Sequence, residues 1–101
     1  MIHVLASNRI KEGRRAEFIE IFKANVPKVL KEKGCLGYVP VVDLPTGKPA
    51  QELDGNAVTI IEKWESLEAL QNHLLAPHMS VYREKVKNLV ESQSLKILQE
   101  A

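Results

Sequence analysis

The residues best suited to chemistry gather in one stretch, EKWESLEALQNHLLAPH, which runs from Glu62 to His78. It contains a glutamate, a tryptophan and two histidines. An imidazole titrates near neutral pH and can act as a general base, and a neighbouring carboxylate can hold its tautomer. An indole ring can form a wall for a flat ligand. The stretch predicts either a site of proton transfer or the packed junction between a strand and two helices.

Each of these residues also has a structural interpretation. Trp64 could seal a sheet against a helix, and His73 could brace a helix junction. Glu62 could pair with a lysine rather than with a histidine, and His78 could simply begin a helix. A metal site built from these residues and His3 is disfavoured, because the sequence has no compact ligand spacing. We therefore expect no metal.

The composition excludes several classes of protein. The 101 residues are 45% apolar and 27% charged, with a formal net charge of +1, so no basic footprint for nucleic acid is present. No apolar run approaches the roughly 20 residues that span a bilayer. The single cysteine, Cys35, allows no internal disulfide, and the first ten residues lack the features of a secretory signal. We expect one cytoplasmic domain over residues 1–101, with a thin core that a partner subunit would support.

The first half of the chain predicts a strand followed by a long helix. Residues 2–10 alternate in the manner of a strand, with the amide of Asn8 on the apolar face. Apolar residues then recur at three- and four-residue steps, which predicts an amphipathic helix over 14–33. Pro27 predicts a kink within it, and Gly34 is expected as its C-cap.

The second half predicts two strands, a broken helix and a final strand. Residues 35–44 form a strand in which Pro40 indicates an edge or bulged position. Residues 45–56 are a polar loop, and residues 57–65 are a third strand with Glu62 and Trp64 on one face. Ser66 is predicted as the N-cap of a helix over 67–75, and Pro77 is expected to begin the next helix. The apolar stripe of that next helix consists of Met79, Tyr82, Val86, Leu89 and Val90. Residues 92–99 are predicted to form the last strand.

This order predicts an α+β fold: a ferredoxin-like split β-α-β sandwich, with an antiparallel sheet and helices on one face. No helix is predicted to cover the other face of the sheet. Because Leu5, Val39 and Ile61 fall on it, the expected cover is the same face of a second copy.

Three segments together resemble the antibiotic biosynthesis monooxygenase family: KEGRRAEF, KGCLGY and the stretch from Glu62 to His78. The resemblance covers essentially residues 1–99 and implies a dimeric α+β barrel. It implies a homodimer with an apolar pocket between sheet and helices in each subunit. It also implies a cofactor-independent monooxygenase acting on a small hydrophobic or aromatic substrate, quinol-like or polyketide-like. Haem-degrading relatives carry a histidine well inside the last helix, and this sequence has none after His78.

The resemblance and the chemistry of the side chains together suggest roles for individual residues. His73 matches the histidine of the family motif and would take the proton, while Asn8 would steady the anion or the oxygen. Trp64, with Tyr38 or Tyr82, would position the ring. Glu62 and His78 complete the expected substrate-binding set.

Two alternatives remain open at this point. The same residues could serve an isomerase or proton-transfer enzyme acting on a small phosphorylated carbonyl compound, with cations such as Arg9, Lys48 and Arg83 at the mouth of the pocket. The chain could also be a non-catalytic dimeric module that binds a hydrophobic ligand. Fold membership alone does not separate these functions.

Overall fold

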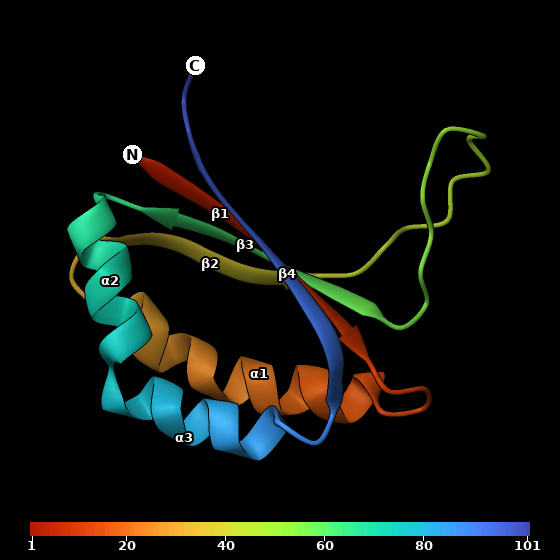
Figure 1. The fold of residues 1–101 in the computed structure, drawn as a ribbon, viewed down its shortest axis with the longest axis horizontal. Helices are drawn as coiled ribbons and strands as arrows, with labels where there is room; N and C mark the ends of the chain where they lie inside the picture. Colours follow the sequence, from red (N-terminus) through yellow and green to blue (C-terminus); the bar gives the residue numbers. More distant parts are fainter.

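The computed structural model describes residues 1–101 and contains four strands and three helices (Figure 1). In chain order the elements are β1 (Ile2–Ile10), α1 (Arg15–Leu30), β2 (Cys35–Val41), β3 (Ala57–Trp64), α2 (Leu67–Leu75), α3 (Pro77–Val86) and β4 (Val90–Gln99). The strands pair antiparallel in the order β2-β3-β1-β4, and the helices lie on one side of the sheet. The predicted ferredoxin-like α+β fold is confirmed.

The core lies between the sheet and the helices, because strand alternation sends every second side chain of β1 and β3 to that side. On β1, Val4, Asn8 and Ile10 are buried on that side, and Ile2 and Ala6 are partly buried. Phe18, Phe22 and Val29 project from α1 toward them and are buried as well, since the apolar stripe of the helix faces the sheet. Trp64, at the end of β3, closes the core near α2 and is fully buried.

The first helix is shorter than predicted. It runs through Pro27 and ends at Leu30, with Lys31 as its C-cap, so the prediction that Gly34 caps it is wrong. Gly34 instead lies in the turn before β2, with a φ of +84°. A Cβ at Gly34 would lie 2.6 Å from the Cβ of Ala69. The glycine therefore allows α2 to approach the start of β2.

The second strand ends at Val41 rather than at residue 44, and it lies at the edge of the sheet, as Pro40 predicts. Residues 42–56 form a long connection that extends away from the body of the molecule (Figure 1). Its return is tied to β1 by an ion pair between Arg9 Nη1 and Asp54 Oδ2, 2.7 Å apart.

The two short helices follow the predicted signals. The Ser66 hydroxyl accepts a hydrogen bond from the Ala69 amide at 3.1 Å, which confirms the N-cap of α2, and Pro77 occupies the first turn of α3. Val90 was expected on the stripe of this last helix, but it is the first residue of β4, because α3 ends at Val86. β4 therefore begins two residues earlier than predicted.

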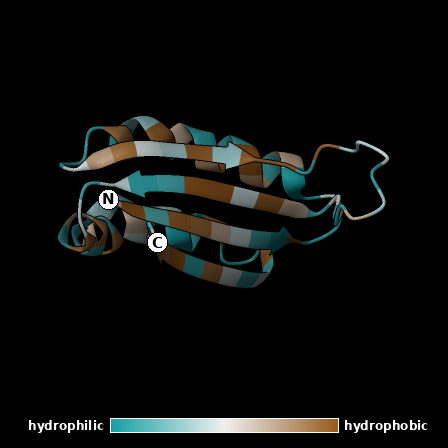
Figure 2. Ribbon diagram, turned by 90° about the horizontal axis from the view of Figure 1, so that it is seen from above, coloured by the Kyte–Doolittle hydropathy of each residue, from teal (hydrophilic) through white to brown (hydrophobic).

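The face of the sheet opposite the helices has no cover in the protomer (Figure 2). Leu5, Ile61 and Val39 lie on neighbouring strands in direct register there, with exposed fractions of 37%, 42% and 47%. Leu98 of β4 lies opposite His3 on the same face and is also exposed. None of the three helices has the length and apolar character needed to cross a bilayer.

Candidate active site around His73

His73 lies at the centre of the site, on the face of α2 that packs against the sheet. Only 1% of its surface is exposed. Its ring centroid lies 4.6 Å from that of Trp64 in a tilted arrangement, and 5.4 Å from that of Tyr38, which meets it edge-on. The chain brings these three rings together because Trp64 ends β3 and α2 begins three residues later, while Tyr38 lies on the adjacent strand β2.

Glu62 and Trp64 interact with each other on the buried face of β3. The indole Nε1–H donates to Glu62 Oε1 at 3.0 Å, and both residues are buried. Burial raises the pKa of the Glu62 carboxyl, and the bond from Trp64 opposes this shift. No histidine or lysine pairs with Glu62, so the hypothesis that it holds a histidine tautomer is wrong.

The carboxylate that binds His73 belongs to Glu32, a residue that the sequence analysis missed. Glu32 follows α1 in the turn before β2, and its Oε2 lies 2.8 Å from His73 Nδ1. The same oxygen lies 3.2 Å from His78 Nε2. A signal for it existed: Glu32 falls three residues after the buried Val29 and so continues the apolar stripe of α1. The sequence analysis assigned no role to this residue.

The buried position of His73 sets its charge. Burial lowers the pKa of this imidazole, and the hydrogen bond that Glu32 accepts from it opposes the shift without reversing it. The ring is therefore neutral at neutral pH and has a lone pair available on one nitrogen. Burial likewise raises the pKa of the Tyr38 and Tyr82 hydroxyls, so both remain protonated donors.

Asn8 does not lie with His73. It pairs with Val58 in the sheet, whereas Trp64 pairs with Ile2, six residues along the same two strands. At about 3.3 Å per residue the two positions are roughly 20 Å apart. The Asn8 amide is used locally: its Oδ1 accepts from Gln93 Nε2 at 2.7 Å, and its Nδ2 lies 3.5 Å from the Val58 carbonyl oxygen. Asn8 and His73 therefore cannot contact the same aromatic ring.

Aromatic side chains fill the space between these two ends. The rings of Phe22 and Tyr38 stack at 5.2 Å, and Tyr82 meets Phe22 edge-on at 5.6 Å. The open pocket that was expected between sheet and helices is therefore occupied by packed side chains. We call Phe18, Phe22, Tyr38, Trp64, His73 and Tyr82 the aromatic cluster.

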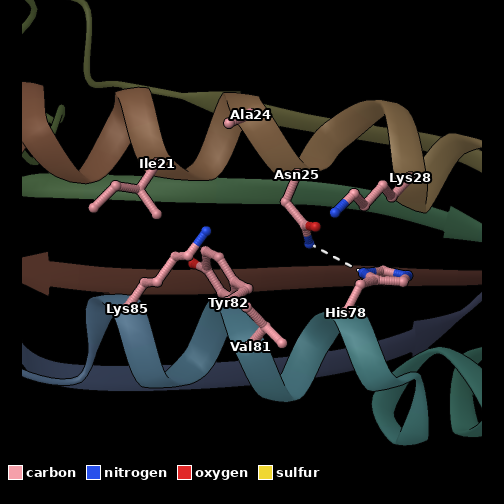
Figure 3. Close-up of a pocket in the computed structure, with 8 residues that line it drawn as sticks. All are labelled: Ile21, Ala24, Asn25, Lys28, His78, Val81, Tyr82 and Lys85. Atoms are coloured by element: carbon pink, nitrogen blue, oxygen red, sulfur yellow. Dashed lines mark hydrogen bonds between the residues drawn. The ribbon is translucent and has the colours of Figure 1, made fainter.

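A small cavity of about 60 Å³ lies beside this cluster, between α1 and α3 (Figure 3). Its lining includes Asn25, His78 and Tyr82, together with Lys28 and Lys85, whose side chains reach into it. His78 and Tyr82, both predicted to bind substrate, thus meet at one cavity.

The cations expected at a pocket mouth lie elsewhere. Arg9 pairs with Asp54, and Arg83 donates to the Leu74 carbonyl at 3.1 Å. Lys48 lies in the exposed connection between β2 and β3. No group of three or more His, Cys, Asp or Glu side chains is placed to hold a metal ion.

Comparison with known proteins identifies the family. Residues 1–85 match the model of the antibiotic biosynthesis monooxygenase family. The chain is 41% identical over 101 residues to the probable quinol monooxygenase YgiN of Escherichia coli and to that of Shigella flexneri, covering 98% of this chain and 97% of each relative.

Solved structures share the fold. A conserved protein from Methanosarcina mazei superposes with a TM-score of 0.84 at 23% identity, covering 99% of this chain and 92% of the other. A protein from Shewanella oneidensis superposes with a TM-score of 0.81 at 26% identity, covering 98% and 89%. This chain belongs to the antibiotic biosynthesis monooxygenase family.

Proposed function

We propose that the protein is a cofactor-independent monooxygenase that oxidises a quinol, with His73 as its general base. The observation that carries the proposal is a buried imidazole packed against Trp64 and Tyr38, with one ring nitrogen held by a carboxylate. The name of the Escherichia coli relative, probable quinol monooxygenase, supports the choice of substrate class.

The proposed chemistry balances without an added reductant. His73 removes a proton from a quinol hydroxyl, and the electron-rich anion reacts with O2, so that a bond forms between a ring carbon and oxygen. The peroxide then loses water, which leaves a hydroxyquinone. The quinol supplies all four electrons, one oxygen atom stays on the ring, and the other leaves as water. The role of the protein is to bind the ring and to lower the cost of the anion.

Substrate entry requires side chains to move. The cavity between α1 and α3 is about 60 Å³, whereas a site for benzene alone needs about 150 Å³. Tyr82 lines this cavity, belongs to the aromatic cluster, and is only partly buried. We propose that displacement of Tyr82 admits the quinol, and that Trp64 and Tyr38 then stack with its ring. In this arrangement Glu62 fixes the indole through its hydrogen bond.

Asn8 has a separate role in this proposal. Because it lies far from His73 along the sheet, it would contact a distal part of the substrate or of a substituent rather than the reacting carbon. We further propose one domain over residues 1–101 and a cytoplasmic homodimer, supported by the exposed apolar side chains on the sheet and by the single free cysteine.

The replacement of His73 tests the proposal. With a panel of quinols, the wild-type protein should consume O2, and 18O2 should place one labelled atom in the product. His73→Gln should lower kcat by about 10²- to 10⁴-fold, the usual contribution of a positioned base. His3→Gln is the matched control, because His3 lies on the opposite sheet face beside Glu100. Equal quinol turnover without oxygen, or full activity in His73→Gln, would exclude the proposed reaction.

A second candidate, proton transfer on a small phosphorylated carbonyl compound, is favoured by one observation. Lys28 and Lys85 reach into the cavity, and neither pairs with a carboxylate within salt-bridge distance. Inorganic phosphate should then inhibit turnover, and the substitution of both lysines by methionine should abolish the inhibition. Oxygen-independent turnover together with this effect would favour the second candidate.

A further inference from the structure

We propose that Glu32 is a positioning residue that fixes His73 in its Nδ1–H tautomer, and that Asn25 secures Glu32 through His78. The inference rests on the proposed role of His73 as base, and it names the side chains that prepare it. These four residues come from α1, the turn after α1, α2 and α3, so the arrangement joins all three helices.

Asn25 determines the tautomer of His78. Its amide Nδ2 lies 3.2 Å from His78 Nδ1 and 3.5 Å from the Met79 sulfur, and Figure 3 shows the amide directed at the ring. An amide nitrogen only donates and has two hydrogens, and a ring nitrogen and a thioether are both acceptors. A reversed amide would place its oxygen against the sulfur. His78 Nδ1 therefore accepts, and the proton of the neutral His78 ring is on Nε2.

Glu32 lies between the two imidazoles. Its Oε2 is 3.2 Å from His78 Nε2, at an angle outside hydrogen-bond geometry, and 2.8 Å from His73 Nδ1 in a good hydrogen bond. The positive edge of the His78 ring thus faces the carboxylate and attracts it electrostatically. The Glu32 side chain is only 17% exposed, so water screens these contacts weakly.

The tautomer of His73 follows from its partner. An ionised carboxylate can only accept, so His73 Nδ1 must carry the hydrogen of the bond to Glu32. A neutral imidazole has one ring hydrogen, which leaves Nε2 with a free lone pair. No protein group forms a hydrogen bond with His73 Nε2, and this nitrogen is the one available to a substrate.

Glu32 also acts after the proton has moved. When Nε2 takes a proton from the quinol, His73 becomes an imidazolium in a buried site, which is costly without an anion nearby. The Glu32 carboxylate, already in contact with Nδ1, stabilises that charge. Its removal should lower kcat while leaving the substrate-binding rings in place, because Trp64 and Tyr38 do not contact Glu32 through any hydrogen bond.

The tautomer can be measured directly on the intact protein. In 15N-labelled wild-type protein, long-range imidazole spectra should show His73 protonated on Nδ1. In Glu32→Ala both tautomers should be populated, and Glu32→Asp should partly restore the Nδ1–H form. Glu32→Gln is the isosteric variant for use if the alanine variant does not fold, and it should lose the single tautomer because its amide can also donate. Glu20→Ala, an exposed glutamate on α1, is the matched control.

Kinetics give the second measurement. Glu32→Ala should lower kcat by about 10²-fold or more with little change in KM, as expected for an interaction that strengthens in the transition state. The acidic limb of the pH profile should move to lower pH, because the hydrogen bond that His73 donates to Glu32 raises the His73 pKa and its loss removes that effect. Glu20→Ala should change neither kcat nor the limb.

The outcomes separate the two proposals. If His73 remains Nδ1–H in both Glu32→Ala and Glu32→Gln, or if kcat and the pH profile are unchanged, the positioning role of Glu32 is overturned. If the tautomer shifts as expected while no quinol is oxidised by the wild-type protein, Glu32 still positions His73 and the proposed quinol oxidation fails.

Discussion

At the scale of single residues, the buried carboxyl of Glu62 lowers the stability of the folded protein when it is ionised. Glu62 is 6% exposed and bonds to the neutral indole of Trp64 rather than to a cation. A buried carboxylate without a positive partner favours its protonated form, which agrees with its raised pKa. Natural proteins accept such costs at sites that serve a function, so this pair also supports the assignment of the site.

Glu62→Gln tests this cost. Because the Glu62 pKa is raised in the folded protein, the folded state keeps a proton on Glu62 at pH values where the unfolded chain releases it. The stability that Glu62 contributes is therefore fully present below the ordinary carboxyl pKa. It is lost as the pH rises through the pKa of Glu62 in the folded state. The free energy of unfolding of the variant should therefore fall less than that of the wild type between about pH 4.5 and pH 8. Urea denaturation across this pH range measures how the free energy of unfolding changes with pH in the variant and in the wild type.

The exposed Glu65→Gln is the control, and its slope should follow the wild type. Parallel wild-type and Glu62→Gln curves would contradict a raised pKa at Glu62.

At the scale of elements, the sequence predicts most of the strands and helices because their apolar periods are clear. Phe18, Phe22 and Val29 define α1, and the alternation around Trp64 defines β3. Two of the wrong boundaries have one reason: local signals do not report tertiary contacts. The prediction of a helix cap at Gly34 is wrong, because the glycine instead leaves room for the close approach of Ala69. Val90 fits a helical stripe, but pairing with Ile10 draws it into β4.

The candidate site shows the same difference between residues marked by local signals and residues brought in by tertiary contacts. His73 and Trp64 were found because they lie in one short stretch with a characteristic motif, whereas Glu32 is 41 residues away from His73 in the chain. Its contact exists only because the turn after α1 folds against α2. Asn8 was linked to His73 through the resemblance alone, and the register of β1 with β3 separates them. Contacts between distant segments depend on register and packing, which a single sequence does not specify.

Gly34→Ala should displace α2 and with it His73. Its new Cβ would meet Ala69 at 2.6 Å, and its φ of +84° disfavours any side chain. Gly13→Ala is a matched control, since Gly13 has a φ of +79° and open space around it. We expect Gly13→Ala to lose about 1–2 kcal/mol of unfolding free energy from the backbone alone, and Gly34→Ala to lose about 1–3 kcal/mol more.

Denaturation measures the loss of stability in the two glycine variants, and quinol oxidation measures whether the site is displaced. Gly34→Ala should also lower kcat, whereas folded Gly13→Ala should keep it. Equal stability and activity of the two variants would show that the approach of α2 to Gly34 does not position the site.

At the scale of the whole molecule, the sheet is covered on one side only. The helices protect the face that carries Trp64 and leave the other face open (Figure 2). Four apolar side chains remain exposed on that open face: Leu5, Val39, Ile61 and Leu98. A row of apolar side chains in register across three strands is costly in water. In the proposed homodimer, the same face of a second copy related by a two-fold axis would cover both rows at once.

Ile61→Lys tests this arrangement, because Ile61 lies between Leu5 and Val39 at the centre of the row. A lysine there would be buried without a partner in the dimer, so the dissociation constant should rise by about 10²-fold or more. Sedimentation equilibrium should give wild-type protein twice the 11.4 kDa mass of the chain and should give Ile61→Lys the monomer mass at the same concentration. Leu75→Lys, on an 80% exposed leucine of α2, should remain dimeric. If the wild-type protein is a monomer at all concentrations, the proposed dimer does not form. If Leu75→Lys dissociates the dimer and Ile61→Lys does not, the dimer interface lies on another surface.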